Sequence, residues 1–228
     1  MLSDESIIKL GQFFRKYKLL KHNKRDLILH ADDTTSSVFF IKTGYIRVYR
    51  ISEKGEELTL TILKPSDSFP LTYGLNSTSN PYYLEAITEL ELWKSPKNDF
   101  ISYIKKEPEL YIELTTRLLV RLDGVMTRME YLLFSNAYTK VATTLLVCAK
   151  RFGVQQDGRT MIHVPLTHRD IATMVGLTRE TTSLEMKKLE KEGYIVKFGR
   201  NLVMQNMKEL ENQIMFRDVD GSSFNYSL

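Results

Sequence analysis

The stretch from Leu166 to Tyr194, LTHRDIATMVGLTRETTSLEMKKLEKEGY, constrains the fold of this chain more than any other. Thr167 stands three residues before Asp170, which is the spacing of a helix-capping box, and apolar residues follow at helical spacing. Gly176 then interrupts that helix, and Thr178 supplies the N-cap of a second one. Two short helices joined by a glycine-containing turn predict a helix-turn-helix.

In this motif the first residues of the second helix enter the DNA major groove. Here they are Arg179 and Glu180, an arginine suited to guanine and a carboxylate suited to cytosine. An ordinary helical hairpin with a charged face is the alternative. However, two apolar strands around a glycine turn, IVKFGRNLVMQN, follow the motif, and TMIHVPL precedes it as a further strand. These flanking strands favour a winged helix-turn-helix.

Basic charge is concentrated in this part of the chain. Residues 135–210 hold 12 Lys and Arg against 7 Asp and Glu, whereas residues 1–134 hold 19 against 18. A locally basic module on a nearly neutral chain is typical of nucleic-acid binding. The basic run at residues 15–25 is a candidate second patch, but apolar residues interrupt it at strand-like spacing, which favours a solvated surface.

Composition excludes several classes of protein and site. No apolar run approaches about 18 residues, so no membrane span is expected. The N-terminus lacks the basic-then-apolar pattern of a signal peptide. The single cysteine, Cys148, excludes an internal disulfide and a cysteine-ligated metal site within one chain, and its apolar helix predicts an inert core thiol. We expect a reducing compartment, most simply a bacterial cytoplasm.

Residues 26–93 change to period-two alternation and short apolar runs bounded by turns. This pattern predicts five to seven antiparallel strands in a jelly-roll-like barrel. The sequence shows no Ser/His/Asp grouping, paired-carboxylate site, phosphate-binding loop or cluster of metal ligands. We therefore expect the barrel to be a sensor or scaffold, the protein not to be an enzyme, and no cofactor to be bound.

From Pro108 the sequence predicts one helix of about 25 residues. A helix of roughly 35–40 Å, at about 1.5 Å per residue, is too long to pack only on its own barrel, which is the alternative. Paired recognition helices about one DNA turn apart also suit an inverted repeat. We therefore predict a homodimer with a coiled-coil seam at 4-3 spacing. The seam residues are Tyr111, Thr115, Leu118, Leu122, Val125, Met129 and Leu132.

These patterns predict an α+β protein in four parts. They are a jelly-roll-like β-barrel at residues 1–107, a long dimerisation helix at 108–134, a winged helix-turn-helix at 135–210 and a C-terminal tail at 211–228. We expect a hinge at the polar residues 135–137, a loop at residues 155–160 and a last short helix after residue 206.

A barrel, a long helix and a winged helix-turn-helix in this order resemble the Crp/Fnr family of bacterial transcription regulators over residues 10–210. The motifs that carry the resemblance are FIKTGYIRVY, GEELTLTILKPSDSF, TLLVCAKRF and LTHRDIATMVGLTRETTSLEMKKLEKEGYI. The resemblance implies a cytoplasmic homodimer that binds a pseudo-palindromic site in double-stranded DNA, commonly under the control of an effector in the barrel. RNA polymerase and a small-molecule effector are further candidate partners.

The barrel departs from the cyclic-AMP-binding members of the family. Those members place a Gly-Glu pair after the strand at SDSF and an Arg-Ser pair further on. The corresponding residues here are Pro70, Leu71, Asn80 and Pro81. Pro70 has no N–H donor, Leu71 cannot accept a bond from ribose, and no cation remains to pair the phosphate. We therefore do not expect cyclic AMP to bind.

Apolar and aromatic residues replace those contacts. One reading is a pocket for a less polar small molecule, and the other is that the side chains simply fill the barrel of an effector-independent dimer. The sequence leaves both open. An iron–sulfur cluster would need several cysteines, and no axial haem ligand can be placed near the long helix. The candidate pocket residues are Phe69, Pro70, Leu71, Tyr73, Tyr82, Tyr83, Val125, Met126 and Met129.

The recognition helix also departs from the family. Arg179 and Glu180 match the base-reading pair, and Ser183 lies where several members place a contact. Leu184 replaces an arginine of many members, and it can touch a thymine methyl but cannot bond guanine. Glu185 takes a position that is usually apolar, so helix packing can differ. We predict base contacts from Arg179, Glu180, Ser183 and Leu184, on a half-site that is not of the TGTGA or TTGAT type.

Contacts to the DNA backbone fix register without reading sequence. For each lysine among the candidates, the alternative is a solvated surface charge. The candidates are Thr167, His168, Thr178, Lys188, Lys197 and Arg200.

Two other functions remain open. A cyclic-nucleotide-binding regulatory module of an enzyme or channel would need the phosphate-binding residues that this chain lacks. A sequence-tolerant architectural DNA binder would have similar affinity for all duplexes at a fixed salt concentration.

Overall fold

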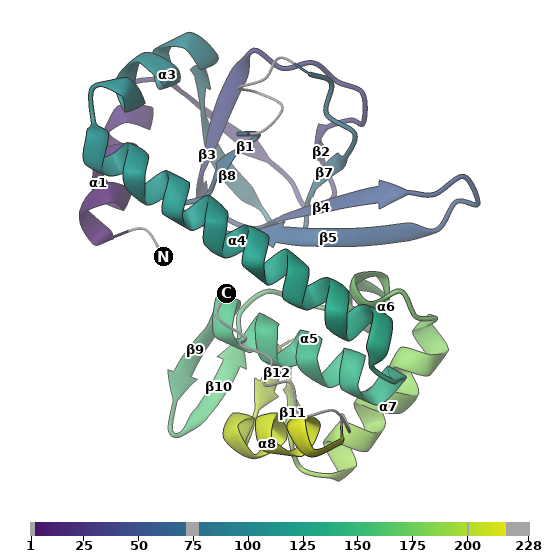
Figure 1. Cartoon of the computed structure of the whole chain (residues 1–228). Coiled ribbons are helices and arrows are strands. Elements are labelled where there is room, and N and C mark those ends of the chain that lie inside the picture. Colours follow the sequence, from purple (N-terminus) through teal and green to yellow (C-terminus); the bar gives the residue numbers. More distant parts are fainter. Residues whose placement is uncertain (1–2, 72–77, 200, 218–228) are drawn as a thin grey trace. The chain divides into compact units, whose positions relative to one another are not determined.

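The computed structural model describes residues 3–71, 78–199 and 201–217, with side chains up to residue 214. The chain forms two compact units, Met1–Leu119 and Val120–Leu228. We call them the barrel unit and the winged unit and describe each by itself (Figure 1).

The barrel unit contains two four-stranded antiparallel sheets, as the alternating pattern predicts. In the first sheet the order is β1, β8, β3, β6, and in the second it is β2, β7, β4, β5 (Figure 1). Neighbouring strands are antiparallel throughout both sheets, which gives the expected jelly-roll-like barrel. The strands are β1 (Lys18–His22), β2 (Leu27–Leu29), β3 (Ser37–Thr43), β4 (Ile46–Ile51), β5 (Glu57–Leu63), β6 (Ser68–Phe69), β7 (Tyr83–Ala86) and β8 (Leu90–Pro96).

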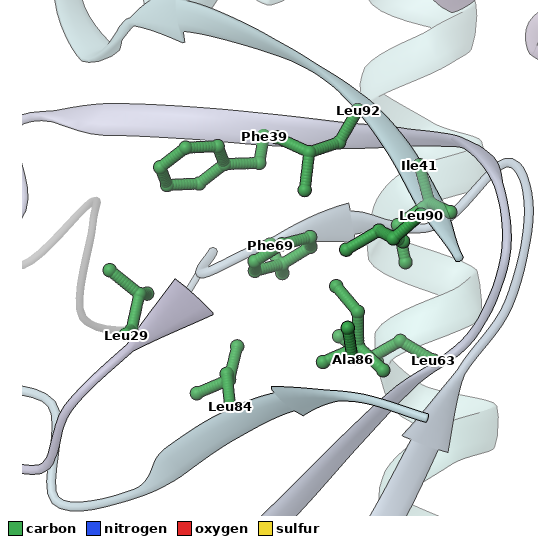
Figure 2. Close-up of a cluster of buried hydrophobic side chains, with 10 residues drawn as sticks. Leu29, Phe39, Ile41, Leu63, Phe69, Leu84, Ala86, Leu90 and Leu92 are labelled. Atoms are coloured by element: carbon green, nitrogen blue, oxygen red, sulfur yellow. The ribbon is translucent and has the colours of Figure 1, made fainter. Parts of the chain in front are cut away.

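Apolar side chains from both sheets meet inside the barrel (Figure 2). The rings of Phe39 and Phe69 stack with their centroids 5.3 Å apart, and Leu84 approaches from the other sheet. Ile41 and Leu92 are completely buried. These side chains from the two sheets form the hydrophobic core of the barrel unit.

A second apolar cluster lies on the other face of strand β3. Phe40 points to this side, whereas its neighbours Phe39 and Ile41 belong to the barrel interior, because successive side chains alternate along a strand. Phe14 of α1 (Asp4–Phe14) and Phe100 of α3 (Lys97–Lys105) pack here. Burial on both faces explains why β3 is a continuous apolar run rather than an alternating one.

The long helix α4 (Pro108–Phe134) has 27 residues and begins at a proline, as predicted. Within the barrel unit Leu110 is fully buried, and Arg117 pairs with the completely buried carboxylate of Asp67. Within the winged unit Tyr131 is buried, and Arg128 Nη2 donates to the carbonyl oxygen of Met174 at 2.5 Å.

The winged unit is built on α5 (Ala137–Phe152), which begins at an Asn136 N-cap and is buried on most sides. Helices α6 (His168–Val175), α7 (Arg179–Lys191) and α8 (Met207–Arg217) all pack against it. The sheet has the order β11, β12, β10, β9 (Figure 1). Its strands are β9 (Gly153–Gln156), β10 (Arg159–Ile162), β11 (Ile195–Phe198) and β12 (Asn201–Met204). The predicted wing corresponds to β11 and β12.

One local feature of the winged unit differs from expectation. Residues 155–160, expected as a loop, belong to a β9–β10 hairpin whose turn is only Asp157 and Gly158, both with positive φ. That conformation suits a two-residue hairpin turn, for which Asp-Gly is a strong signal. The last short helix expected after residue 206 is present as α8, Met207–Arg217, and its residues Leu210 and Ile214 are buried.

Cys148 lies completely buried on α5, and burial raises the pKa of its thiol to about 12. The thiol is therefore protonated at neutral pH, in agreement with the expected inert core thiol. Among the residues that the structure describes, no helix is both long enough and apolar enough to cross a membrane.

Candidate nucleic-acid interface

The first helix of the motif, α6, begins with a complete capping box. Asp170 N–H donates to Thr167 Oγ1 at 3.2 Å, and the Asp170 carboxylate accepts from Thr167 N–H at 2.7 Å. The Thr167 hydroxyl also lies 2.6 Å from this carboxylate. Both residues are therefore occupied in fixing the start of α6, as the S/T-x-x-D spacing predicts.

The turn between the two helices is set by backbone conformation. Gly176 has φ +66°, in the left-handed region that favours glycine, and its N–H bonds the carbonyl of Ala172. The next N–H, of Leu177, bonds the same carbonyl at 3.2 Å. Thr178 then caps α7, because its hydroxyl accepts from Thr181 N–H at 3.1 Å. These bonds determine where the first turn of α7 begins.

Replacing Thr178 with alanine is expected to lower the free energy of unfolding by about 0.5–2 kcal/mol, because an N–H of the first turn of α7 loses its acceptor. Thr178→Ser keeps the oxygen and is the matched control. Urea unfolding followed by circular dichroism measures both variants. An alanine variant as stable as the serine variant would contradict the capping role.

One side of α7 packs into the unit and the other faces outward. Thr182, Met186 and Leu189 are buried at helical spacing. Arg179 and Glu180 are exposed at the start of the helix, and these two are predicted to read bases. Leu184 is 59% exposed on the same side, and Ser183 is partly buried.

Glu185, the residue at a usually apolar position, is buried to 8% exposure. Its carboxylate forms an ion pair with Lys188 at 2.8 Å, one helical turn further on. A carboxylate at a buried position needs such a partner. Lys188, predicted to contact phosphate, is thus engaged within its own helix.

Lys187 was not among the predicted phosphate contacts, but it is exposed on α7 and is better placed for such a contact than Lys188. It lines a cavity of about 60 Å³ together with His168 of α6 and Lys197 of β11. Met186, Glu190 and Ile195 complete the lining. Its position seven residues after Glu180, on the exposed side of α7, was a signal that could have identified it. Two further predicted phosphate contacts, Thr167 and Thr178, are exposed. The last one, Arg200, lies outside the described residues.

Burial lowers the pKa of His168, and the positive charges of Lys197 and Arg179 lower it further. Glu190 acts in the opposite direction, and Lys187 adds to the lowering. The imidazole is therefore mostly neutral near pH 7. The structure thus brings three of the predicted DNA-contact residues, His168, Arg179 and Lys197, into one positively charged environment.

The candidate effector residues of the barrel unit do not form one group. Phe69 belongs to the barrel interior and Tyr82 packs against it, whereas Leu71 packs in the second cluster beneath α1. Tyr83 instead stacks on Tyr49, with ring centroids 5.3 Å apart. Pro70 is buried, and Tyr73 lies outside the described residues. Val125, Met126 and Met129 are exposed on α4 in the winged unit.

Asn80, which we expected in place of the phosphate-binding arginine of cyclic-AMP-binding members, is buried and bonded both to Tyr82 and to the segment that follows β2. Its Nδ2 donates to the carbonyls of Tyr82 at 2.6 Å and His30 at 3.2 Å. Its backbone carbonyl accepts from Asp32 N–H at 2.6 Å. The amide therefore joins two segments of the barrel unit and brings no positive charge to it.

The predicted dimer seam is an exposed apolar stripe on α4. Leu122 and Val125 are 55% and 54% exposed, and Leu132 is the one seam residue that is partly buried. A neighbouring column at seven-residue spacing widens the stripe: Ile112, Leu119, Met126 and Leu133. The remaining seam residues, Tyr111, Thr115, Leu118 and Met129, are also exposed. Large exposed apolar stripes mark interaction surfaces.

Two family models match the chain in the order that the fold shows. Residues 139–213 match a Crp-like helix-turn-helix domain, and residues 19–107 match a cyclic nucleotide-binding domain. The chain belongs to the Crp/Fnr family. As a Crp/Fnr protein it is a DNA-binding transcription regulator, and the alternative of a regulatory module of an enzyme or channel is not favoured.

This Crp/Fnr regulator is similar in sequence to regulators with different names and in structure to a solved member of the family. A CRP-like cAMP-activated global transcriptional regulator from Mycobacterium tuberculosis is 28% identical over 76% of this chain and 77% of that protein. A global nitrogen regulator from Nostoc sp. is 27% identical over 76% of this chain and 78% of its own. The solved structure of FixK2 from Bradyrhizobium japonicum has a TM-score of 0.75 at 25% identity, covering 86% of this chain and 96% of FixK2.

Proposed function

We propose that this Crp/Fnr regulator acts as a homodimer that reads a pseudo-palindromic DNA site with the first turn of α7. The observation that carries the proposal is the outward-facing start of α7, where Arg179 and Glu180 are exposed directly after the Thr178 cap. Arginine pairs with guanine and glutamate accepts from cytosine in the major groove. Leu184 adds an apolar surface for a thymine methyl, and Ser183 lies beside it.

The homodimer is supported by the exposed apolar stripe of α4. In the barrel unit the other side of the helix already packs on its own protomer, through Leu110 and the Arg117–Asp67 pair. A second copy of α4 supplies an apolar partner for the stripe at the spacing of a coiled coil. The pair of winged units then presents two recognition helices to two half-sites.

We further propose that DNA binding does not depend on cyclic AMP. Leu71 replaces the ribose-binding glutamate and packs in the cluster with residues of α1, and the amide of Asn80 is bonded to the carbonyls of Tyr82 and His30. The packed interior between Phe39, Phe69 and Leu84 favours the effector-independent reading over an apolar effector in the barrel. We also propose that the DNA-bound dimer binds RNA polymerase.

Selection of bound DNA from a random pool tests this function. We expect an inverted repeat whose half-site centres lie about 34–36 Å apart, or a multiple of that distance. Added cyclic AMP should leave the Kd for the selected site unchanged within about twofold, which is less than 0.5 kcal/mol. Equal affinity for selected and random duplexes would instead indicate an architectural DNA binder. Tight cyclic-AMP binding in calorimetry would contradict the proposal that the protein does not respond to cyclic AMP.

A further inference from the structure

The cavity between α6, α7 and β11 has the chemistry of a site for an oxyanion. The residues that line it include two lysines, Lys187 and Lys197, and His168, with Glu190 as the single acidic residue. Its volume of about 60 Å³ admits groups of the size of water, such as the oxygens of one phosphate.

His168, which lines this cavity, has an unused hydrogen-bonding atom on its imidazole. Its Nε2 is buried and has no hydrogen-bond partner in the described part of the chain. Buried polar atoms are nearly always paired, so an unpaired one on a residue that lines a cavity points to a partner that binds there later. A phosphate oxygen is a strong acceptor for a protonated imidazole nitrogen.

The charges that face His168 come from two elements. Arg179, Lys187 and Glu190 lie on α7, and Lys197 lies on β11. Three cations against one carboxylate leave the surroundings of His168 positive, which disfavours a further positive charge on the imidazole in the free protein. A bound phosphate adds negative charge beside His168 and therefore favours the protonated imidazole.

We propose that His168, Lys187 and Lys197 form one pocket for a backbone phosphate of DNA, and that His168 gains a proton when the phosphate binds. The inference rests on the proposed DNA-binding function and adds to it a coupling between DNA affinity and pH. The proton comes from solvent and resides on the imidazole, so that both ring nitrogens become donors. Contact with the sugar-phosphate backbone makes the coupling independent of base sequence.

The sign of the coupling follows from the two states. The free protein has a His168 pKa below the ordinary value of about 6.5, and a bound phosphate raises it. Affinity is therefore highest below the free-state pKa, decreases as the pH rises through the bound-state pKa, and is constant above it. A difference of about one pKa unit corresponds to about a tenfold change in Kd for each half-site.

Fluorescence anisotropy of the full chain on the selected duplex, from about pH 5.5 to about pH 8 at constant salt, tests the proposal. The natural protein should bind about tenfold more weakly per half-site at the upper end, and His168→Gln should show a flat profile. His163→Gln is the matched control, because His163 is exposed in the same unit, and it should keep the natural profile. Random duplex should show the same pH dependence as the selected one.

A second readout does not depend on the variant folding. The ring protons of His168, followed by NMR in the natural protein, should titrate at a higher pH when the selected duplex is bound. Identical pH profiles for the natural protein and His168→Gln, with DNA binding intact, would overturn the proposal. Saturable binding of inorganic phosphate at His168, without a pH effect on DNA affinity, would assign the pocket to a free anion and also overturn it. Absence of DNA binding at every pH would contradict the proposed function itself.

Discussion

Replacing Leu122 with glutamate is expected to convert the protein into monomers and to weaken binding to the selected inverted repeat by about 100-fold or more. Leu122 lies in the middle of the exposed stripe of α4 at 55% exposure. In a dimer the new carboxylate faces apolar side chains of the second copy without a partner, which is strongly unfavourable. Each monomer then binds one half-site and loses the gain from two linked sites, commonly about 10²–10⁴ in affinity.

Sedimentation measures the mass of the variant, and anisotropy on selected and half-site duplexes measures its affinity. Thr116→Glu is the matched control, because Thr116 is also exposed on α4 but lies outside the apolar stripe. This control should remain a dimer with unchanged affinity. A dimer mass for Leu122→Glu would remove the seam as the interface, and the widened stripe would then need another partner.

The helix-turn-helix could be predicted in detail because its boundaries are set by local chemistry. The Thr167–Asp170 capping box, the left-handed Gly176 and the Thr178 cap each act over a few residues, so the sequence alone contains them. The long helix was predictable for a similar reason: a proline starts it at residue 108, and its apolar spacing continues without a break. The β9–β10 hairpin carried an equally local Asp-Gly signal, which was overlooked.

The candidate effector pocket shows where sequence reasoning loses accuracy. Tyr82 and Tyr83 are adjacent, and neighbouring side chains along an extended chain point to opposite sides. Tyr82 accordingly packs on the barrel interior, whereas Tyr83 stacks on Tyr49. Strand geometry therefore argues against placing both tyrosine side chains in one cavity. Leu71 could not be placed by this rule, because its cluster includes residues of α1 and α3 that are distant in sequence.

Long-range ion pairs were beyond prediction. Arg47 lies between two carboxylates, at 2.9 Å from Glu57 and 3.1 Å from Glu85, and its guanidinium stacks on the ring of Tyr49 at 4.0 Å. The two carboxylates come from β5 and β7, which pair with β4 on either side, so only the arrangement of the strands brings them to Arg47, whereas Tyr49 is its neighbour on β4 itself. In α7, by contrast, the Glu185–Lys188 pair is local. Because this pair engages Lys188, the phosphate contact is proposed for Lys187, which lines the cavity with His168. The local pair could have been anticipated from i,i+3 spacing.

Replacing Arg179 with alanine is expected to weaken binding to the selected site by about 1–3 kcal/mol, or roughly 5- to 150-fold, and to relax base preference at one position of each half-site. The guanidinium stands exposed directly after the Thr178 cap, so its removal leaves the fold intact. Anisotropy on duplexes that carry each base at each position measures the loss of discrimination.

Lys191→Ala is the matched control, since Lys191 is exposed in the last turn of the same helix, away from the end that enters the groove. It should leave base preference unchanged. If Arg179→Ala weakened selected and random duplexes equally, the arginine would act as a phosphate contact like Lys187. Sequence reading would then have to come from Glu180 and Leu184. Because Leu184 has no hydrogen-bonding group, such a protein would discriminate thymine methyl groups far better than guanine.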